Sequence, residues 1–443
     1  LGRRIYYFNQ SVAIKLALLY RVSVAVTAVL CLTLLPLTNS AAAAPEKFSF
    51  TGSGYGHGVG MSQIGARAKA LAGESATAIL NYYYSGTKVE TATDSKILRI
   101  NIGHLLKSTK VRSDSNGAKL QLFAGALSES KTADVLLDIP SKTTLNVEIS
   151  GSQLNISTTQ GANTTPIANG TSFTLRWSGT RHMDGAPTVI SVTANSTVNK
   201  YRYGQIQFKV IKDKLLGNRL SIINSVRLQD EYLWGISEVP SSWPSAALEA
   251  QAIASRTYAL NKAGIYRSSC DCDLYGEISD QRFLGFAKET EKNWGRFWKA
   301  AVTSTAGLTM TQNNLPIAAY FGSSTGGLTE TALNAWGTDR TYTQIVADPG
   351  SQDPKLNPNF FSWKRSVPQA TVALAFAMPD VVTLEILSKN LSGTVGMIRA
   401  TSSTGIQKSL RGETFRSRTK IPSAYFDLVS VQNAVEPTPS ASP

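Results

Sequence analysis

A rigid corner followed by a long helix is the feature that most constrains how this chain folds. Residues 238–244 read Glu-Val-Pro-Ser-Ser-Trp-Pro, and an alanine-rich run follows from Ser245 to about Lys262. Each proline disfavours the α conformation in the residue before it, so the corner stays extended until the helix begins. Glu238 is thereby fixed near Trp234, Val239 and Trp243, apolar surroundings that would raise its pKa and suit a general acid and base. The alternative is a solvated loop glutamate.

The composition indicates a globular chain with an anionic partner. Of 443 residues, 42% are hydrophobic and 17% are charged, which suits two or three domains with a sizeable core. The net charge is +14, and the first 44 residues hold four basic residues and no acid, which leaves +10 on the remainder. Nucleic acid is a common partner for such a charge. We predict no nucleic acid here, because the N-terminus indicates export.

The N-terminus has the pattern of a secretory signal. Basic residues precede an apolar run from Val22 to Leu37, and four alanines, Ala41 to Ala44, follow it. That order matches the n-region, h-region and cleavage site of a signal peptide, which we predict at 1–44. An uncleaved membrane anchor is the alternative, although the apolar run is short for a span. We therefore expect a secreted, extracellular protein that contacts a membrane only if the signal is retained.

The rest of the chain predicts an α+β fold with a β-rich insertion. Residues 45–104 and 199–432 mix short strands with helices. Between them, residues 105–198 are rich in serine, threonine and asparagine, with short alternating runs separated by turns. We predict that this segment is a β-rich insertion outside the catalytic site. The proline- and serine-containing tail at 433–443 is predicted to be disordered.

A glycine-rich segment at 52–66 reads Gly-Ser-Gly-Tyr-Gly-His-Gly-Val-Gly-Met-Ser-Gln-Ile-Gly-Ala. It lacks the Gly-Lys-Ser/Thr of a P-loop, and no register places a glycine sixth in the dinucleotide pattern, so nucleotide binding is excluded. Glycines at alternate positions allow close backbone approach to a ligand or strand. His57 is a candidate for ligand binding or proton handling, or a structural histidine. Ser62 and Gln63 are candidates for sugar contacts, with capping of the next helix as the alternative.

A second small-residue loop, Gly322-Ser-Ser-Thr-Gly326, fits the pattern of a nucleophilic serine. The context argues against that role, because glycine follows and the three histidines, His57, His104 and His182, all lie upstream. We interpret Ser323, Ser324 and Thr325 as the lining of a sugar groove. The remaining substrate-binding candidates, for each of which a structural place in the core or on the surface is the alternative, are Trp243, Arg256, Tyr258, Tyr320 and Glu330.

Three motifs together resemble the stage II sporulation protein D family, whose domain is also called SpoIID/LytB. They are residues 52–66, residues 238–260, and residues 319–330 with Ala335-Trp-Gly337. The resemblance covers most of the chain after Pro45 and implies a SpoIID-like catalytic part interrupted by the β-rich insertion. In the sporulation proteins the glycine-histidine segment follows the glutamate, whereas here it precedes it. The site is therefore preserved only if the fold brings the two segments together.

The resemblance implies a lytic transglycosylase. Such an enzyme cleaves peptidoglycan glycan strands, here strands stripped of stem peptides, between N-acetylmuramic acid and N-acetylglucosamine to leave 1,6-anhydro ends. Hydrolytic glycosidases use two carboxyl groups, but one suffices when the muramic acid C6 hydroxyl attacks its own anomeric carbon, and the family places that carboxyl at Glu238. The alternative is a non-catalytic wall-binding protein that enhances an N-acetylmuramoyl-L-alanine amidase. The expected partners are glycan strands and a cell-wall amidase.

Two cysteines remain after Cys31, which lies inside the predicted signal. Cys270 and Cys272 flank Asp271, and an exported protein favours a disulfide, although so tight a ring is strained. Zinc is the rival, because relatives carry a metal-binding cysteine and histidine cluster nearby. This chain has no histidine within reach in sequence, and Asp280 stands where those relatives have cysteine. We expect that no cofactor is required, with zinc at these cysteines as the alternative.

Overall fold

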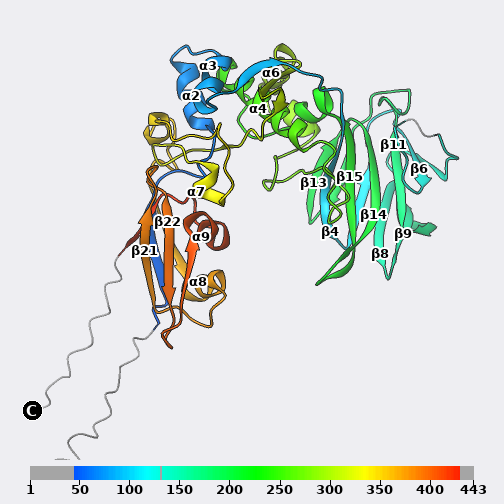
Figure 1. Ribbon diagram of the computed structural model, residues 1–443. Coiled ribbons are helices and arrows are strands. Elements are labelled where there is room, and N and C mark those ends of the chain that lie inside the picture. Colours follow the sequence, from blue (N-terminus) through cyan, green and yellow to red (C-terminus); the bar gives the residue numbers. More distant parts are fainter. Residues whose placement is uncertain (1–43, 130–131, 430–443) are drawn as a thin grey trace, which may run out of the picture.

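The computed structural model describes residues 44–129 and 132–429. A helical middle part connects two β-rich lobes, so the described chain forms an arch (Figure 1). The predicted signal peptide, apart from Ala44, and the predicted tail at 433–443 lie outside the described residues. Within the described ranges, no helix combines the length and the apolar character needed to cross a membrane. Helices and separate sheets coexist, which confirms the α+β class.

The larger lobe is a sandwich of two sheets that face each other (Figure 1). Buried and exposed residues alternate along its strands, and the inward side chains, such as Val111, Val147, Leu175 and Ile222, share one hydrophobic core. One sheet has the order β16 (Leu274–Tyr275), β4 (Ile97–Leu106), β15 (Gly217–Arg227), β14 (Gln205–Asp213), β11 (Ser172–Trp177), β6 (Lys119–Ala124) and β7 (Leu137–Pro140). The other has the order β10 (Asn163–Gly170), β9 (Gln153–Gln160), β8 (Thr144–Ser150), β5 (Ser108–Arg112), β12 (Ile190–Ala194) and β13 (Thr197–Tyr201).

The boundaries predicted for the β-rich insertion fall inside this sandwich. β4 crosses the 104/105 boundary and β13 crosses the 198/199 boundary. β11, from the predicted insertion, pairs with β14 from the part that follows it. The sandwich core also includes Tyr258 and Trp298, which lie on helices of the middle part. The predicted insertion therefore shares its sheets and its core with residues on either side of it.

The middle part is built from helices around a small core that includes Ile79, Ile253 and Met310. The Ser62 hydroxyl caps the first of these helices by accepting a hydrogen bond from the Gly65 N–H at 3.0 Å, as the sequence predicted. The long helix begins and ends where predicted. The helices are α2 (Gln63–Leu71), α3 (Ala76–Tyr83), η1 (Leu228–Tyr232), α4 (Ser245–Lys262), α5 (Phe286–Glu289), α6 (Gly295–Ser304), α7 (Ala332–Trp336) and η2 (Pro349–Gln352). The short strands among them are β2 (Met61–Ser62), β3 (Lys88–Thr91), β17 (Leu308–Gln312), β18 (Leu315–Pro316) and β19 (Phe321–Gly322).

The smaller lobe combines the start and the end of the described chain. Its core packs Phe50 against Phe415 and Phe426, with ring centroids 5.6 and 5.5 Å apart. The first strand pairs on both edges with strands from the C-terminal part, which carries the glycine-rich segment toward the middle of the arch. The elements are β1 (Lys47–Gly52), β20 (Trp363–Pro368), α8 (Gln369–Phe376), β21 (Thr383–Lys389), β22 (Val395–Thr401), β23 (Gln407–Arg411), α9 (Gly412–Thr419) and β24 (Phe426–Val429).

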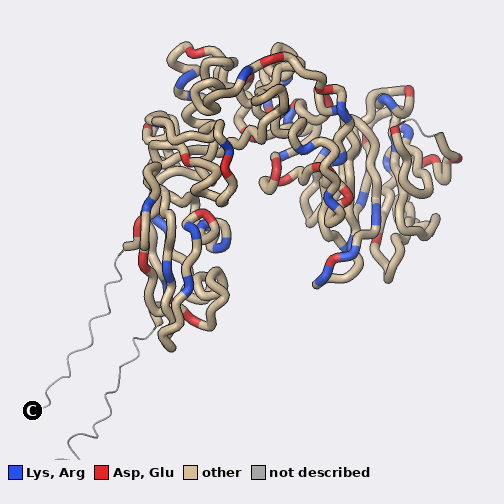
Figure 2. The backbone as a smooth tube through the Cα atoms, viewed as in Figure 1, with Lys and Arg blue, Asp and Glu red and all other residues tan. Residues whose placement is uncertain are grey.

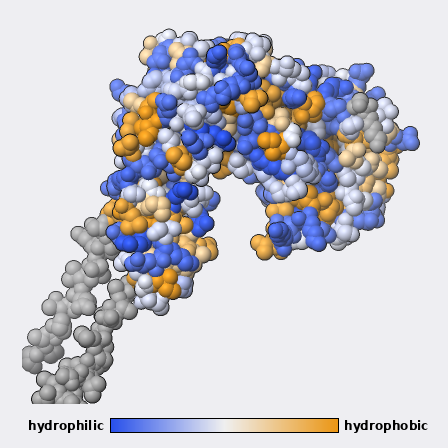
Figure 3. All heavy atoms as spheres, viewed as in Figure 1, coloured by the Kyte–Doolittle hydropathy of each residue, from blue (hydrophilic) through white to orange (hydrophobic). Residues whose placement is uncertain are grey.

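Charged residues are distributed over both lobes and the middle part. In the view of Figure 2, Lys and Arg are interspersed with Asp and Glu and do not gather on one large face. The space-filling view shows that the molecule is hollowed between the lobes (Figure 3).

Candidate active site

A cleft of about 590 Å³ lies where the three parts of the arch meet. It contains Glu238 together with residues from segments far apart in the sequence. The stretches that line it are 55–57, 237–238, 278–280 with Arg282, and 320–323, with single residues from α2, α4, α7 and α9 and the loop at Phe360. The expectation that the glycine-rich segment and the glutamate corner share one cleft is confirmed, although their order along the chain is reversed relative to the sporulation proteins.

Glu238 is held at the edge of this cleft by main-chain bonds on both sides. The neighbouring Ser237 N–H donates to the Arg282 carbonyl at 2.8 Å. The Arg282 N–H in turn donates to Oε1 of Glu238 at 2.5 Å. Burial raises the pKa of the Glu238 carboxyl, and the bonds from the Arg282 N–H and the Gln63 amide offset that rise only in part. A half-buried carboxyl with a raised pKa is suited to hold a proton and then release it.

Asp280 is the other carboxyl that lines the cleft, and both of its oxygens are occupied. Oδ1 accepts from the Tyr258 hydroxyl at 2.9 Å and from Nη2 of Arg267 at 2.8 Å. Oδ2 accepts from Nη1 of Arg267 at 2.6 Å and from the Tyr275 N–H at 2.8 Å. The Tyr258 pKa is raised well above its usual value, first by burial and then by the Asp280 charge. The Asp280 carboxylate therefore fixes neighbouring groups and has no oxygen left for a substrate.

The opposite wall is formed by the glycine-rich segment, which pairs with the loop at 320–324. β2 lies parallel to β19, and Tyr55 exchanges backbone hydrogen bonds with Ser324 at 3.0 and 3.2 Å. Glycine is required at Gly60, where φ is +75° and a Cβ would lie 2.0 Å from the Tyr320 carbonyl oxygen. The glycines of this motif thus allow one backbone to lie directly against another.

Three rings from this wall gather in the cleft. The ring centroids of His57 and Trp336 are 5.0 Å apart, those of Tyr320 and Trp336 are 4.8 Å apart, and both pairs meet edge to face. Nδ1 of His57 accepts from the Val59 N–H at 3.0 Å. Burial, with the nearby Arg416 charge, lowers the His57 pKa to about 4. The imidazole is therefore neutral near pH 7, and the three rings form a surface suited to stacking against a sugar.

The structure brings six of the predicted site residues into the cleft: Glu238, His57, Gln63, Tyr258, Tyr320 and Ser323. The remaining candidates lie outside it. The Trp243 ring packs at the edge of the sandwich core, with the Arg67 guanidinium 5.5 Å from its centroid. Arg256 is fully buried and paired with Asp94 at 3.0 Å, because every face of α4 is covered and the charge needs a partner inside.

The remaining polar candidates are also engaged in the interior. Besides capping α2, Ser62 lies 3.1 Å from the Ser351 hydroxyl. The Thr325 hydroxyl donates to Asp348 at 2.7 Å, and Ser324 is buried against the glycine-rich segment. Glu330 is buried and accepts from four side chains of the small lobe and α7, which are Asn334, Asn390, Ser392 and Thr394. Position in a motif did not distinguish residues that line the cleft from residues that hold its walls.

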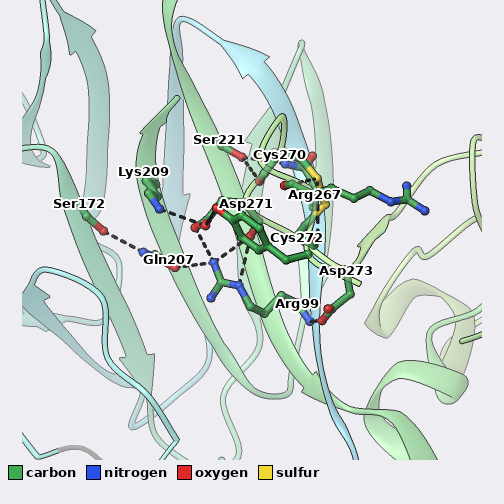
Figure 4. Close-up of polar contacts among 12 residues, drawn as sticks. Arg99, Ser172, Gln207, Lys209, Ser221, Arg267, Cys270, Asp271, Cys272 and Asp273 are labelled. Carbon is green, nitrogen blue, oxygen red and sulfur yellow. Dashed lines mark hydrogen bonds and ion pairs between the residues drawn. A yellow bond between two sulfur atoms is a disulfide. The ribbon is translucent and has the colours of Figure 1, made fainter. Parts of the chain in front are cut away.

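Cys270 and Cys272 form a disulfide in the loop after α4 (Figure 4). Between them, Asp271 pairs with Arg99 at 2.6 Å and with Lys209 at 3.0 Å, which attaches the loop to strands of the sandwich. Both cysteines are buried. Among the described residues, no group of three or more histidine, cysteine, aspartate or glutamate side chains is arranged to hold a metal ion. The disulfide is one of the predicted alternatives, and the expectation that no cofactor is required stays a prediction.

The sequence did not predict several residues of the cleft, among them Asp280 as a lining residue, Arg282, Phe360 and Arg416. A signal for Arg282 was present in the sequence, because Arg282 lies two residues after Asp280, which stands where the relatives have a cysteine. Arg416 and Phe360 lie more than a hundred residues from Glu238 and belong to none of the three motifs. Only the packing of the small lobe brings them to the cleft.

The cleft thus combines one available acid, a neutral histidine and three rings that meet edge to face. Residues 217–312 match the family described as SpoIID: Stage II sporulation protein. The chain is 27% identical over 219 residues to Stage II sporulation protein D of Bacillus subtilis (strain 168), and 28% identical over 220 residues to the protein of that name from Bacillus amyloliquefaciens. Each of these matches covers 45% of this chain and 59% of the relative. These matches confirm the recognition based on the motifs, and the match to the family model lies at residues 217–312.

A further relative is named for another activity. The chain is 30% identical over 121 residues to a protein called Amidase enhancer from Bacillus subtilis (strain 168). That match covers 27% of this chain and 15% of the relative. The chain thus spans about three fifths of the sporulation proteins and a small part of the amidase enhancer.

Proposed function

We propose that this protein is an exported lytic transglycosylase that cleaves peptidoglycan glycan strands after N-acetylmuramic acid. One observation carries the proposal. Two carboxyl groups line the cleft in the described part of the chain. Asp280 has both oxygens bound by its neighbours, whereas Glu238 faces the cleft with a raised pKa. A hydrolase that relies on a pair of carboxyl groups would need a second free one. A transglycosylase needs only the one that is present.

The reaction follows from that single carboxyl group. The protonated Glu238 donates its proton to the glycosidic oxygen, and the bond from that oxygen to C1 of N-acetylmuramic acid breaks. The C6 hydroxyl of the same sugar then forms a bond to C1, and the Glu238 carboxylate removes the hydroxyl proton. The products are a 1,6-anhydromuramic acid end and a new free hydroxyl on the leaving sugar. Glu238 ends the cycle protonated, so neither water nor a metal ion is consumed.

The walls of the cleft support this chemistry in different ways. The Arg282 N–H and the Gln63 amide hold the carboxyl in place and stabilise its ionised form after the proton has left. The rings of His57, Tyr320 and Trp336 offer a face on which a sugar can stack. Both arginines of the cleft, Arg282 and Arg416, are suited to an anionic glycan.

The test is the product of the reaction. Purified protein incubated with glycan strands that lack stem peptides should release fragments with anhydro ends, which lie one water mass below hydrolysis products in mass spectrometry. Glu238→Gln keeps the shape of the side chain but cannot transfer a proton, so turnover should fall by about a thousandfold. Binding of the glycan should stay within a few-fold. Products with the mass of hydrolysis, or normal turnover by the variant, would disprove the proposal.

The match to an amidase enhancer supports a second candidate, a non-catalytic protein that binds the wall and increases the rate of an N-acetylmuramoyl-L-alanine amidase. The same preparation distinguishes the two. If the protein releases no anhydro product but accelerates an added cell-wall amidase on intact peptidoglycan, and Glu238→Gln does so equally well, the second candidate is correct.

A further inference from the structure

Among the residues that the structure describes, four that line the cleft have side chains that can carry a full charge near neutral pH: Glu238, Asp280, Arg282 and Arg416. The Asp280 charge is neutralised by a two-pronged ion pair with Arg267. Glu238 is protonated when it acts as the acid, so it contributes no negative charge at the start of the reaction. The guanidinium groups of Arg282 and Arg416 remain. The Arg416 charge is balanced by the buried Glu413 carboxylate, so Arg282 supplies the unbalanced positive charge and Arg416 supplies a positioned donor.

Arg416 is held in a fixed orientation. It comes from α9 in the small lobe, and its Nε and Nη2 donate to the two oxygens of Glu413 at 2.8 and 2.7 Å. Glu413 is buried, whereas the Arg416 side chain is 23% exposed. Within the described residues, Nη1 of Arg416 forms no hydrogen bond. An arginine whose planar group is already positioned loses little freedom when it binds a carboxylate, so it is well suited to recognise one.

Arg416 lies on the same wall as the rings. Its charge acts on His57, whose ring packs against Trp336. A sugar that stacks on this wall would place its substituents near the unpaired edge of the guanidinium. In the proposed substrate, the two sugars differ by the lactyl ether of N-acetylmuramic acid. That ether ends in a free carboxylate when no stem peptide is attached, and in an uncharged amide when one is.

We propose that Arg416 is a specificity-determining residue that binds the free lactyl carboxylate of N-acetylmuramic acid and so selects glycan without stem peptides. The inference rests on the proposed function for the identity of the sugar. Arg416 belongs to the small lobe and lies outside the segment that matches the family. In this proposal it distinguishes a glycan strand without stem peptides from one that carries them. Arg282, with no side-chain hydrogen bond or ion pair among the described residues, is the second cation that the same strand meets.

The experiment compares two glycans that differ only in that carboxylate. One is glycan freed of stem peptides, and the other is the same material with its lactyl carboxyls converted to methylamides. Binding is measured with the Glu238→Gln background, so the result does not depend on turnover. We expect that background to bind the free acid roughly 10- to 100-fold more tightly than the amide. Adding Arg416→Gln should remove the difference by weakening only the free acid.

Controls separate recognition from folding. Arg418→Gln changes the neighbouring arginine of α9, which bonds the Ala375 carbonyl and does not line the cleft, so selectivity should be unchanged. Arg416→Gln alone leaves the Glu413 charge buried without a partner, which can destabilise the protein. The double variant Glu413→Gln/Arg416→Gln removes both charges. It should fold and show the same loss of selectivity. Arg416→Lys keeps the positive charge but lacks the planar guanidinium group, so it should retain part of the selectivity.

The outcomes are distinguishable from those of the proposed function. Equal binding of the two glycans by the background protein, or selectivity that persists in both glutamine variants, would overturn the assignment of Arg416 even if anhydro products are formed. Conversely, selectivity that depends on Arg416 in a protein that forms no anhydro product would support the carboxylate site while disproving the transglycosylase. Salt should weaken binding of the free acid more than binding of the amide.

Discussion

The two walls of the cleft are built differently, although one ligand must touch both. One wall comes from the segment that matches the SpoIID family and contains Glu238, Tyr258, Asp280 and Arg282. In this wall, Asp280 is fixed by an ion pair, and Glu238 and Tyr258 are fixed by hydrogen bonds that involve a carboxylate. The other wall comes from the glycine-rich segment, the loop at 320–323, α7 and α9. It is fixed by backbone pairing and carries rings and a cation.

This difference indicates a division of tasks. The wall from the segment that matches the SpoIID family, here called the family wall, holds the Glu238 carboxyl in one place and raises its pKa. Proton transfer requires both. The second wall offers surfaces that bind without reacting, since His57 is neutral near pH 7. We infer that changes in the first wall alter turnover and changes in the second wall alter affinity. The predictions below test that division.

The largest effect is expected where the second wall depends on backbone contact. In Gly60→Ala the new Cβ meets the Tyr320 carbonyl oxygen at 2.0 Å in a left-handed conformation, so the unfolding free energy should fall by about 3 kcal/mol or more. Gly73→Ala is the matched control, because its φ of +90° is also left-handed but nothing lies within 4 Å of a Cβ. That control should cost about 1 kcal/mol. Urea unfolding of both variants measures the difference, and equal losses would mean that backbone pairing does not hold this wall.

The next effect concerns the ion pair behind the family wall. Asp280→Asn removes the charge that Arg267 and Tyr258 share, and because Arg267 is partly exposed we expect a loss of about 2 kcal/mol in stability. Turnover should fall by about tenfold or less, since Asp280 positions groups and exchanges no proton with the substrate. A loss as large as that of Glu238→Gln would make Asp280 a second catalytic carboxyl and would end the one-carboxylate mechanism.

The pH profile sharpens the same comparison. A general acid must be protonated at the start, so activity falls as pH rises through the Glu238 pKa. Burial raises that pKa, so the fall should begin at higher pH than for an exposed glutamate. Asp280→Asn should show the same fall of activity at high pH, with no second pH-dependent step. Protonation of His57 should play no part above pH 5, since its pKa is about 4, and a proton NMR titration of the imidazole checks that value.

A smaller effect is expected from the rings of the second wall. Trp336→Ala removes the ring that contacts both His57 and Tyr320, and KM should rise by about fivefold to tenfold with little change in kcat. Trp294→Ala is the matched control, because Trp294 is 44% exposed and does not line the cleft. A drop in kcat with unchanged KM for Trp336→Ala would contradict the division between the walls.

The sequence predicted the elements of both walls better than the roles of their side chains. The caps and lengths of α2 and α4 follow from local signals, such as Ser62 before the first helix and two prolines before the second. Periodicity could not place Arg256, because α4 is covered on all sides and has no polar face that would show which residues meet the cleft. Arg416 was missed for the opposite reason. It has an ordinary i,i+3 partner in Glu413, and only tertiary packing gives that pair a position beside His57.

The smallest effect is expected behind the family wall, at the disulfide. Cys270 and Cys272 close a ring of only three residues, and a short ring constrains the unfolded chain little, so replacing both with serine should cost about 1 kcal/mol or less in stability. Asp271 keeps its ion pairs with Arg99 and Lys209, so the loop that carries Asp280 and Arg282 should stay in place. Activity should therefore remain within a few-fold of wild type, and chelators should have little effect. Stoichiometric zinc in the purified protein, lost together with activity on chelation, would instead make this loop part of the site and would mean that the family wall depends on a metal as well as on its ion pairs.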